Sequence, residues 1–216
     1  MVHHTRTRVK ICGVTTAHDA AAAVGAGADA VGVILAPSKR QVSVTEGEAI
    51  LARVPPLVCR VGVFVDADQA FVEDAVARLG LGLVQYSGSE TPEACASAPT
   101  PVLKTVHVGT LFDSVALEPY RGFVAAILLD TLANGLQGGT GNTFAWQTVH
   151  ELPEWAPMFV AGGLTSFNVG AAIRALRPFA VDVSSGVEER PGRKDHSKID
   201  AFVAAVAAAD AEVSRT

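Results

Sequence analysis

The sequence has few aromatic residues and no concentration of positive charge. Of its 216 residues, 6% are aromatic and 18% are charged, and the formal net charge is −5. The absence of a block rich in Lys and Arg argues against nucleic acid as a partner. With 49% hydrophobic residues, the composition is typical of a globular chain, and its core is expected to consist of small and β-branched side chains.

Cysteine is also scarce. Cys12, Cys59 and Cys95 form no CxxC pair, and an odd number at wide spacing argues against a disulfide framework and for a reducing compartment, so we expect a cytoplasmic protein. The polar first eight residues lack the apolar region of a signal peptide. The apolar stretch 20–37 is interrupted by Asp29 and three glycines, which predicts a helix, a turn and a strand, and no membrane span.

The main pattern along the chain is an alternation of short apolar runs with helical segments. The runs are rich in Val and Ile and mostly do not alternate apolar with polar, which is typical of parallel strands buried on both faces. About eight such repeats predict an α/β fold, a single (β/α)8 TIM barrel spanning residues 1–216. The expected strands are 9–12, 30–35, 60–65, 83–86, 102–108, 124–130, 158–161 and 180–183. The expected helices are 15–27, 45–53, 68–79, 92–98, 165–176 and 197–209, with a further short helix between 109 and 120.

The alternative architecture is a doubly wound open sheet. A GxGxxG motif is missing after the first strand, which argues against dinucleotide binding, and no Pro/Ser-rich linker divides the chain. The long Gly-rich stretch 134–143 is expected to form a flexible βα loop over an active site.

Two residues at predicted strand ends are candidates for acid–base chemistry, because TIM-barrel active sites lie at the carboxyl ends of the strands. Cys12 ends the first strand, where Lys10 and the following helix N-terminus are expected to acidify a thiol; the alternative is an inert buried cysteine. Asp130 closes an otherwise apolar strand, where desolvation would raise its pKa and suit it to act as an acid. For Asp130 the alternative is a helix cap or an ion-pair partner.

Two glycine-containing loops are expected after the last two strands. Gly162 and Gly163 precede the seventh helix, and Ser184, Ser185 and Gly186 follow the eighth strand. Loops at these positions frequently bind phosphate in such barrels, with backbone N–H groups and hydroxyls as donors. Ordinary tight turns are the alternative.

Arg40 follows the second strand in a polar loop. It is expected on the other side of the barrel mouth from the two glycine-containing loops, where it can bind a carboxylate through two parallel hydrogen bonds. A solvated loop charge is the alternative.

Nine segments, taken in order along nearly the whole chain, resemble the phosphoribosylanthranilate isomerases of tryptophan biosynthesis. The residues that carry the resemblance are 9–13 (VKICG), 27–32, 37–40, 60–65, 128–131, 138–141, 161–164, 181–188 and 192–195. The resemblance implies that Cys12 is the catalytic base and Asp130 the catalytic acid. It also implies that Arg40 holds the anthranilate carboxylate and that Asp182 lies near the substrate. The phosphate cradle would consist of Gly162, Gly163, Ser184, Ser185 and Gly186.

One departure from the family pattern concerns the end of the fourth strand. The family usually reads VQLHG there, whereas residues 84–88 read VQYSG, so that Ser87 stands in place of a histidine and Gln85 is retained. A hydroxyl cannot carry positive charge, so any electrostatic role of that histidine is lost. His107, after the fifth strand, would compensate in part, although a plain loop histidine is the default interpretation.

The reaction implied by the resemblance is an Amadori rearrangement of N-(5-phosphoribosyl)anthranilate to 1-(2-carboxyphenylamino)-1-deoxyribulose 5-phosphate. It needs an acid and a base, and we expect no cofactor and no metal. The expected partner is this small phosphorylated molecule, with no nucleic acid and no membrane, and the expected state is a monomer or a homodimer. Two alternatives remain: the related isomerase of histidine synthesis, which uses a pair of aspartates and is disfavoured by Cys12, and a non-catalytic phosphosugar-binding paralogue, favoured only by Ser87.

Overall fold

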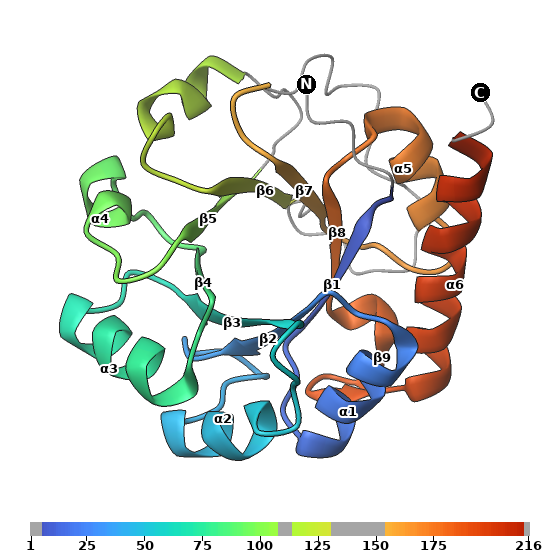
Figure 1. Cartoon of the computed structure of the whole chain (residues 1–216), viewed down its shortest axis with the longest axis horizontal. Coiled ribbons are helices and arrows are strands. Elements are labelled where there is room, and N and C mark those ends of the chain that lie inside the picture. The colour runs from blue at the N-terminus through green and yellow to red at the C-terminus, as the bar shows by residue number, and fades with distance from the viewer. Residues whose placement is uncertain (1–5, 108–113, 131–153, 214–216) are drawn as a thin grey trace.

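Eight parallel strands close into a barrel in the computed structural model, which describes residues 6–107, 114–130 and 154–213 (Figure 1). Each strand pairs with the next along the chain, and β8 pairs with β1 to close the sheet. The strands are β1 Arg8–Cys12, β2 Ala30–Ile34, β3 Cys59–Phe64, β4 Leu83–Tyr86, β5 Val102–His107, β6 Ala126–Asp130, β7 Met158–Ala161 and β8 Ala180–Val183. Closure confirms the predicted TIM barrel and excludes the open sheet, because β1 has a partner on both sides.

Helices surround the barrel between the strands (Figure 1). They are α1 Ala17–Ala26, α2 Val44–Leu51, α3 Gln69–Leu79, α4 Pro92–Ala96, α5 Val169–Leu176 and α6 His196–Val213, with the 3-10 helices η1 Ser114–Tyr120 and η3 Ser185–Val187. The N-cap of α1 is Thr16, which accepts from the Asp19 amide, and α2 begins with a capping box between Ser43 and Glu46. Within the described residues, no helix is long and apolar enough to cross a membrane.

A short antiparallel hairpin follows η3 and was not predicted from the sequence. It consists of β9 Glu188–Arg190 and β10 Arg193–Lys194. The Gly-rich stretch 134–143 lies outside the described residues.

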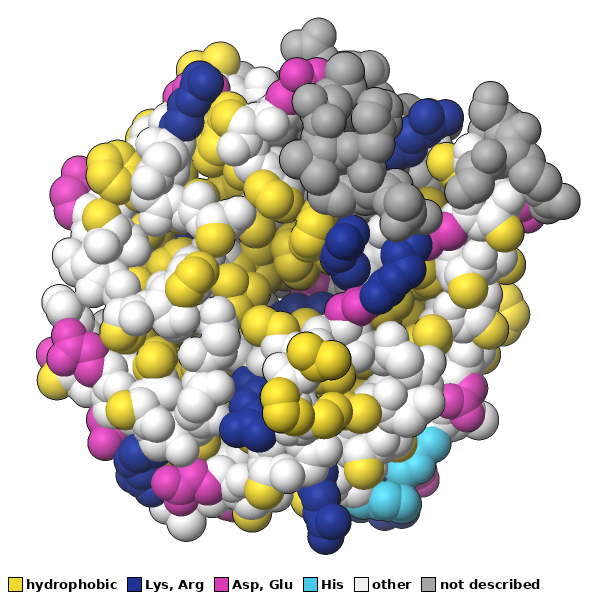
Figure 2. Space-filling view, in the orientation of Figure 1, with side chains coloured by type: hydrophobic (Ala, Val, Ile, Leu, Met, Phe, Trp, Pro, Cys, Tyr) yellow, Lys and Arg dark blue, Asp and Glu magenta, His cyan; other side chains and the backbone are white. Residues whose placement is uncertain are grey.

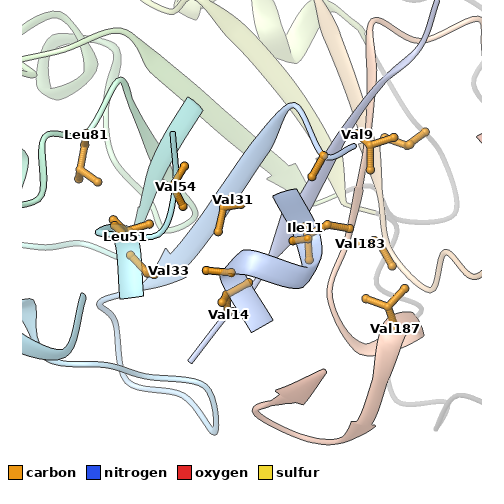
Figure 3. Packing of buried hydrophobic residues seen from close by; sticks show 14 of the residues in the cluster. Val9, Ile11, Val14, Val31, Val33, Leu51, Val54, Leu81, Val183 and Val187 are labelled. Carbon is orange, nitrogen blue, oxygen red and sulfur yellow. The ribbon is translucent and has the colours of Figure 1, made fainter. Parts of the chain in front are cut away.

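The main hydrophobic core lies between the strands and the helices. Val9 and Ile11 of β1, Val31 and Val33 of β2 and Val183 of β8 belong to this cluster (Figure 3). Because successive strand residues point to opposite faces, Lys10, Cys12 and Asp182 point into the barrel. The alternation in β1 and β8 thus places polar side chains inside and apolar ones outside.

The barrel interior has a smaller apolar cluster of its own, formed by Leu103, Ala126, Leu128, Phe159, Ala161 and Ala180. Figure 2 shows hydrophobic side chains around the centre of the visible face. This cluster fills the barrel near β5 to β8, and the cavity beside it is lined by polar groups of β1, β4 and β8 together with Ile34 of β2 and Val63 of β3.

Candidate active site

A cavity of about 290 Å³ opens at the carboxyl ends of the strands. This volume lies near the lower end of the range for small-molecule sites, roughly 300–1,000 Å³. The structure brings all of the sequence-predicted candidates to this one cavity. Its lining includes Cys12, Arg40, Gln85, Ser87, Asp130, Gly162, Gly163, Asp182, Ser184, Ser185 and Gly186.

Cys12 is the last residue of β1 and its side chain is buried. It pairs in register with Gly32, where an added Cβ would lie 3.1 Å from the Cys12 Sγ and 3.3 Å from the Lys10 Cε. The thiol and the Lys10 side chain therefore both occupy space that the missing side chain of Gly32 leaves. Burial raises the pKa of the Cys12 thiol, and Lys10 offsets this only in part. The expected acidification of Cys12 is therefore wrong in its net direction, because desolvation outweighs the nearby cation.

Asp130 is the last residue of β6, and its side chain is 23% exposed. It pairs in register with His107, the last residue of β5, and the His107 Nδ1 lies 3.8 Å from the Asp130 Oδ2. His107, expected to be a plain loop residue, therefore ends a strand beside the candidate acid. This pairing places an imidazole and a carboxyl at the same edge of the barrel.

Arg40 donates from Nε and Nη2 to the two carboxylate oxygens of Glu188, each at 2.7 Å. Both its Cδ and the Ser184 Oγ lie within 3 Å of the position that a Cβ on Gly13 would take. Arg40 therefore lies next to the loop after β8, and the expectation that it lies across the mouth from that loop is wrong. Glu188 uses the Nε and Nη2 donors on one edge of the guanidinium, and the Nη1 donors take no part in this pair.

Glu188 also accepts from Lys194, whose Nζ lies 3.0 Å from its Oε1 and 3.1 Å from the Ser184 carbonyl oxygen. Burial opposes the charge of Glu188, but the hydrogen bonds and charges of Arg40 and Lys194 lower its pKa below the ordinary value. Burial also lowers the pKa of Lys194, and Glu188 offsets only part of that effect. The hairpin β9–β10 thus supplies a buried ion-pair network that fixes both Arg40 and the loop after β8.

The loops after β7 and β8 meet closely. Gly162 and Gly163 have φ values of 87° and 64°, which favour glycine. A Cβ on Gly186 would lie 1.8 Å from the Leu164 carbonyl oxygen. Asn168 fixes the first loop, because its Nδ2 donates to the Gly163 oxygen at 2.9 Å and its Oδ1 accepts from the Thr165 amide at 2.7 Å. The two loops are therefore in backbone contact, and both line the same cavity.

Gln85 and Ser87 form a hydrogen-bonded group with Thr105 of β5. The Gln85 Nε2 donates to the Ser87 Oγ at 3.1 Å and to the Thr105 Oγ1 at 3.2 Å, and the two hydroxyl oxygens lie 2.9 Å apart. The Gln85 Oε1 is buried and has no hydrogen-bond partner among the described residues. Because an unsatisfied buried acceptor costs about 1–3 kcal/mol, a ligand donor would be favoured there.

Several residues of the site were not singled out from the sequence. Thr105 belongs to this group, and Glu188 and Lys194 were noted only as parts of resembling segments. Thr105 shares its strand with Lys104 and His107, so no signal in the sequence sets it apart. In the described part of the chain, no group of three or more His, Cys, Asp and Glu side chains is arranged to hold a metal ion.

The closed barrel and the cavity at the carboxyl ends of its strands define a TIM-barrel enzyme. The chain matches the family model described as N-(5'phosphoribosyl)anthranilate (PRA) isomerase over residues 9–205. An N-(5'-phosphoribosyl)anthranilate isomerase of Pseudomonas fluorescens is 46% identical over 202 residues, which cover 92% of this chain and 95% of that protein. The chain therefore belongs to the N-(5'-phosphoribosyl)anthranilate isomerase family.

Two solved structures support the same relationship. The crystal structure of phosphoribosyl anthranilate isomerase from Thermotoga maritima has a TM-score of 0.84 and 40% identity, and the match covers 94% of this chain and 99% of that one. A phosphoribosyl anthranilate isomerase in complex with reduced 1-(o-carboxyphenylamino)-1-deoxyribulose 5-phosphate has a TM-score of 0.80 and 39% identity, with the same coverage.

Proposed function

We propose that Cys12 is the base and Asp130 the acid of the isomerisation that defines this family. By its family membership the chain is an aldose–ketose isomerase of tryptophan biosynthesis, which converts N-(5'-phosphoribosyl)anthranilate by an Amadori rearrangement. The observation that carries the assignment of roles is that the thiol, the carboxyl, Arg40 and both glycine-containing loops line one cavity. The ligand held by the 39% identical neighbour is a reduced form of the expected product.

The proposed chemistry begins with Asp130, which donates a proton to the ribose ring oxygen. The C1–O bond breaks, and the nitrogen lone pair forms an iminium with C1. Cys12, as thiolate, then removes the C2 proton to give an enolamine. The ketone forms when C1 gains the proton held by Cys12 and the C2 hydroxyl returns a proton to Asp130. Both groups regain their starting states, and the sum of the steps is an isomerisation.

The remaining candidates are assigned to substrate binding. Gly162, Gly163, Ser184, Ser185 and Gly186 would hold the phosphate through backbone N–H groups and hydroxyls. Arg40, held by Glu188 through one edge, would use its Nη1 edge for the anthranilate carboxylate. The Gln85 Oε1, which lacks a partner among the described residues, would accept from a substrate hydroxyl beside Ser87.

Substitution of the two proposed catalytic groups tests this assignment. We expect Cys12→Ala and Asp130→Ala each to lower kcat by at least roughly 10²–10⁴-fold, the usual contribution of one general acid or base, while the affinity for a product analogue changes little. Steady-state assays with substrate generated in situ, together with calorimetric binding of the reduced product, measure both quantities. Cys59→Ala is the matched control, because Cys59 lies at the start of β3. A Cys12→Ala enzyme with near-normal kcat would contradict the proposal.

A further inference from the structure

We infer that Lys10 and Asp182 form a buried ion pair that sets how readily Cys12 gains and loses its proton, with Lys10 favouring the thiolate and Asp182 limiting that effect. This inference rests on the proposed role of Cys12 as the base. Neither residue would touch the reacting carbons; both are positioning residues that act through Cys12.

The geometry of the pair follows from the register of the barrel. Lys10 and Asp182 lie opposite each other on β1 and β8, and the Lys10 Nζ lies 2.9 Å from the Asp182 Oδ1. The two side chains are 1% and 9% exposed. Lys10 precedes Cys12 by two positions on the same strand, so both side chains point into the barrel. Gly32 has no side chain, and the Lys10 Cε and the Cys12 Sγ both lie next to the position that its Cβ would take.

The charged and titratable groups around Cys12 come from five parts of the molecule. Lys10 lies on its own strand, Asp182 on β8, Lys194 on β10 and Arg40 in the loop after β2. Asp130 lines the same cavity from β6. Lys10 is also the cation whose Cε lies 3.3 Å, and the Cys12 Sγ 3.1 Å, from the position that a Cβ on Gly32 would take. It can favour the thiolate only while it is charged. Burial lowers the pKa of Lys10, but Asp182 and Cys12 together outweigh burial and raise that pKa to about 12.

Asp182 has a second effect that opposes the first. Its negative charge disfavours the thiolate directly and partly neutralises Lys10. A base is most effective when its pKa lies near the working pH, since a fully stabilised thiolate would be a weak base and a fully desolvated thiol would stay protonated. Lys10 and Asp182 push the thiol in opposite directions and so hold it between these limits.

A purely structural ion pair is the competing interpretation. Buried pairs contribute little net stability, and removing either partner leaves an uncompensated charge that destabilises the fold in both cases. Loss of structure would thus affect Lys10 and Asp182 variants in the same direction. A role in setting the protonation of Cys12 requires opposite directions.

The test measures the Cys12 thiolate directly. In a Cys59→Ala/Cys95→Ala background, the ultraviolet absorbance of thiolate is titrated with pH, and the same background carrying Cys12→Ala is subtracted. We expect the thiol to titrate at lower pH in Asp182→Asn than in the unsubstituted background, and at higher pH in Lys10→Met. A charge within about 4–6 Å corresponds to at least roughly a tenfold change in the thiolate fraction at fixed pH.

Two further variants separate charge from packing. Lys10→Met/Asp182→Asn leaves no unpaired charge and is expected to titrate below Lys10→Met, and Lys10→Arg, which keeps the cation, is expected to stay near the unsubstituted background. If Lys10→Met does not fold, Asp182→Asn and the double variant still decide the matter. Shifts of the same sign in Asp182→Asn and Lys10→Met, or no shift in Asp182→Asn, would overturn the inference.

The kinetic profile distinguishes failure of this inference from failure of the proposed function. If Cys12 is the base, the acidic limb of kcat/KM against pH moves in the same order as the thiolate titration. If the thiolate titrates in the expected order of variants but the acidic limb of kcat/KM does not move in that order, the role of Cys12 as the base is wrong. If Cys12→Ala abolishes turnover but the thiolate titration is not shifted in opposite directions by Asp182→Asn and Lys10→Met, the inference about Lys10 and Asp182 is wrong.

Discussion

Ser87 stands where the family resemblance leads us to expect histidine, and the structure shows which contacts its hydroxyl makes. It lies 2.9 Å from the Thr105 Oγ1 and accepts from the Gln85 Nε2 at 3.1 Å. These contacts hold the Gln85 amide with its buried Oε1 unpartnered among the described residues. The surroundings of Ser87 are therefore arranged for a small hydroxyl.

We predict that Ser87→His lowers kcat/KM. The larger side chain would displace Thr105 or Gln85, and overpacking of this kind costs about 1–3 kcal/mol, which corresponds to roughly a fivefold or greater loss if the cost falls on the transition state. Ser87→Ala, which removes one hydroxyl and adds no bulk, is the control and is expected to lose less. Steady-state kinetics of both variants measure the effect. A clear gain in Ser87→His would show instead that the missing histidine limits the enzyme.

At the scale of elements, the loops after β7 and β8 depend on each other. Gly186 in η3 approaches the Leu164 carbonyl so closely that a Cβ would lie 1.8 Å from its oxygen. The hairpin β9–β10 fixes the loop after β8, because the Lys194 Nζ donates a hydrogen bond to the Ser184 carbonyl oxygen. The geometry of the proposed phosphate cradle is thus a property of two loops and a hairpin together.

We therefore predict that Gly186→Ala raises KM by at least about tenfold and lowers kcat less, because the added methyl forces the two loops apart and weakens ground-state binding of the phosphate. The inhibition constant of inorganic phosphate, measured in parallel, should rise with KM. Gly25→Ala is the matched control: Gly25 is exposed in α1, and an added Cβ there meets nothing within 4 Å. An unchanged KM in Gly186→Ala would contradict the placement of phosphate between these loops.

Elements with strong patterns were predictable from the sequence, and short charged ones were not. β4, β7 and β8 have the predicted bounds, because each is a compact run of mostly apolar residues. The hairpin β9–β10 reads Glu-Glu-Arg and Arg-Lys, which has no apolar face to indicate a strand. The rule that TIM-barrel sites lie at the carboxyl ends of the strands identified the strand-end candidates. It cannot predict which side chains pair, as Arg40 does with Glu188 across 148 positions of sequence.

At the scale of the whole molecule, two carboxylates link parts of the chain that are distant in sequence. Glu188 joins Arg40 of the loop after β2 to Lys194 of β10. Asp29, just before β2, accepts from the Val9 amide at 2.9 Å and also binds Arg6. For both, hydrogen bonds and nearby cations outweigh burial and lower the pKa below its ordinary value. That the full range 1–216 forms one domain stays a prediction, since residues 1–5, 108–113, 131–153 and 214–216 lie outside the described part.

These shifts predict that the fold loses stability in acid. A carboxylate whose pKa is lower in the folded than in the unfolded chain contributes stability that is complete above its ordinary value, here 4.5 for Glu188 and 3.8 for Asp29, and that is lost as the pH falls through the folded value. We expect Glu188→Gln to reduce the free energy of unfolding by about 3 kcal/mol near neutral pH, because it leaves buried Lys194 without its partner.

The test compares how the free energy of unfolding depends on pH in Glu188→Gln and in the unsubstituted chain. Urea unfolding at a series of pH values should show the difference between Glu188→Gln and the unsubstituted chain shrinking as the pH falls below 4.5, since protonation of Glu188 removes the same charge that the substitution removes. Glu48→Gln, which alters an exposed ion pair with Arg78, is the control and should change stability by no more than about 1 kcal/mol at any pH. Curves for Glu188→Gln and the unsubstituted chain that stay parallel down to acid would mean that the ion pairs of Glu188 do not supply this stability.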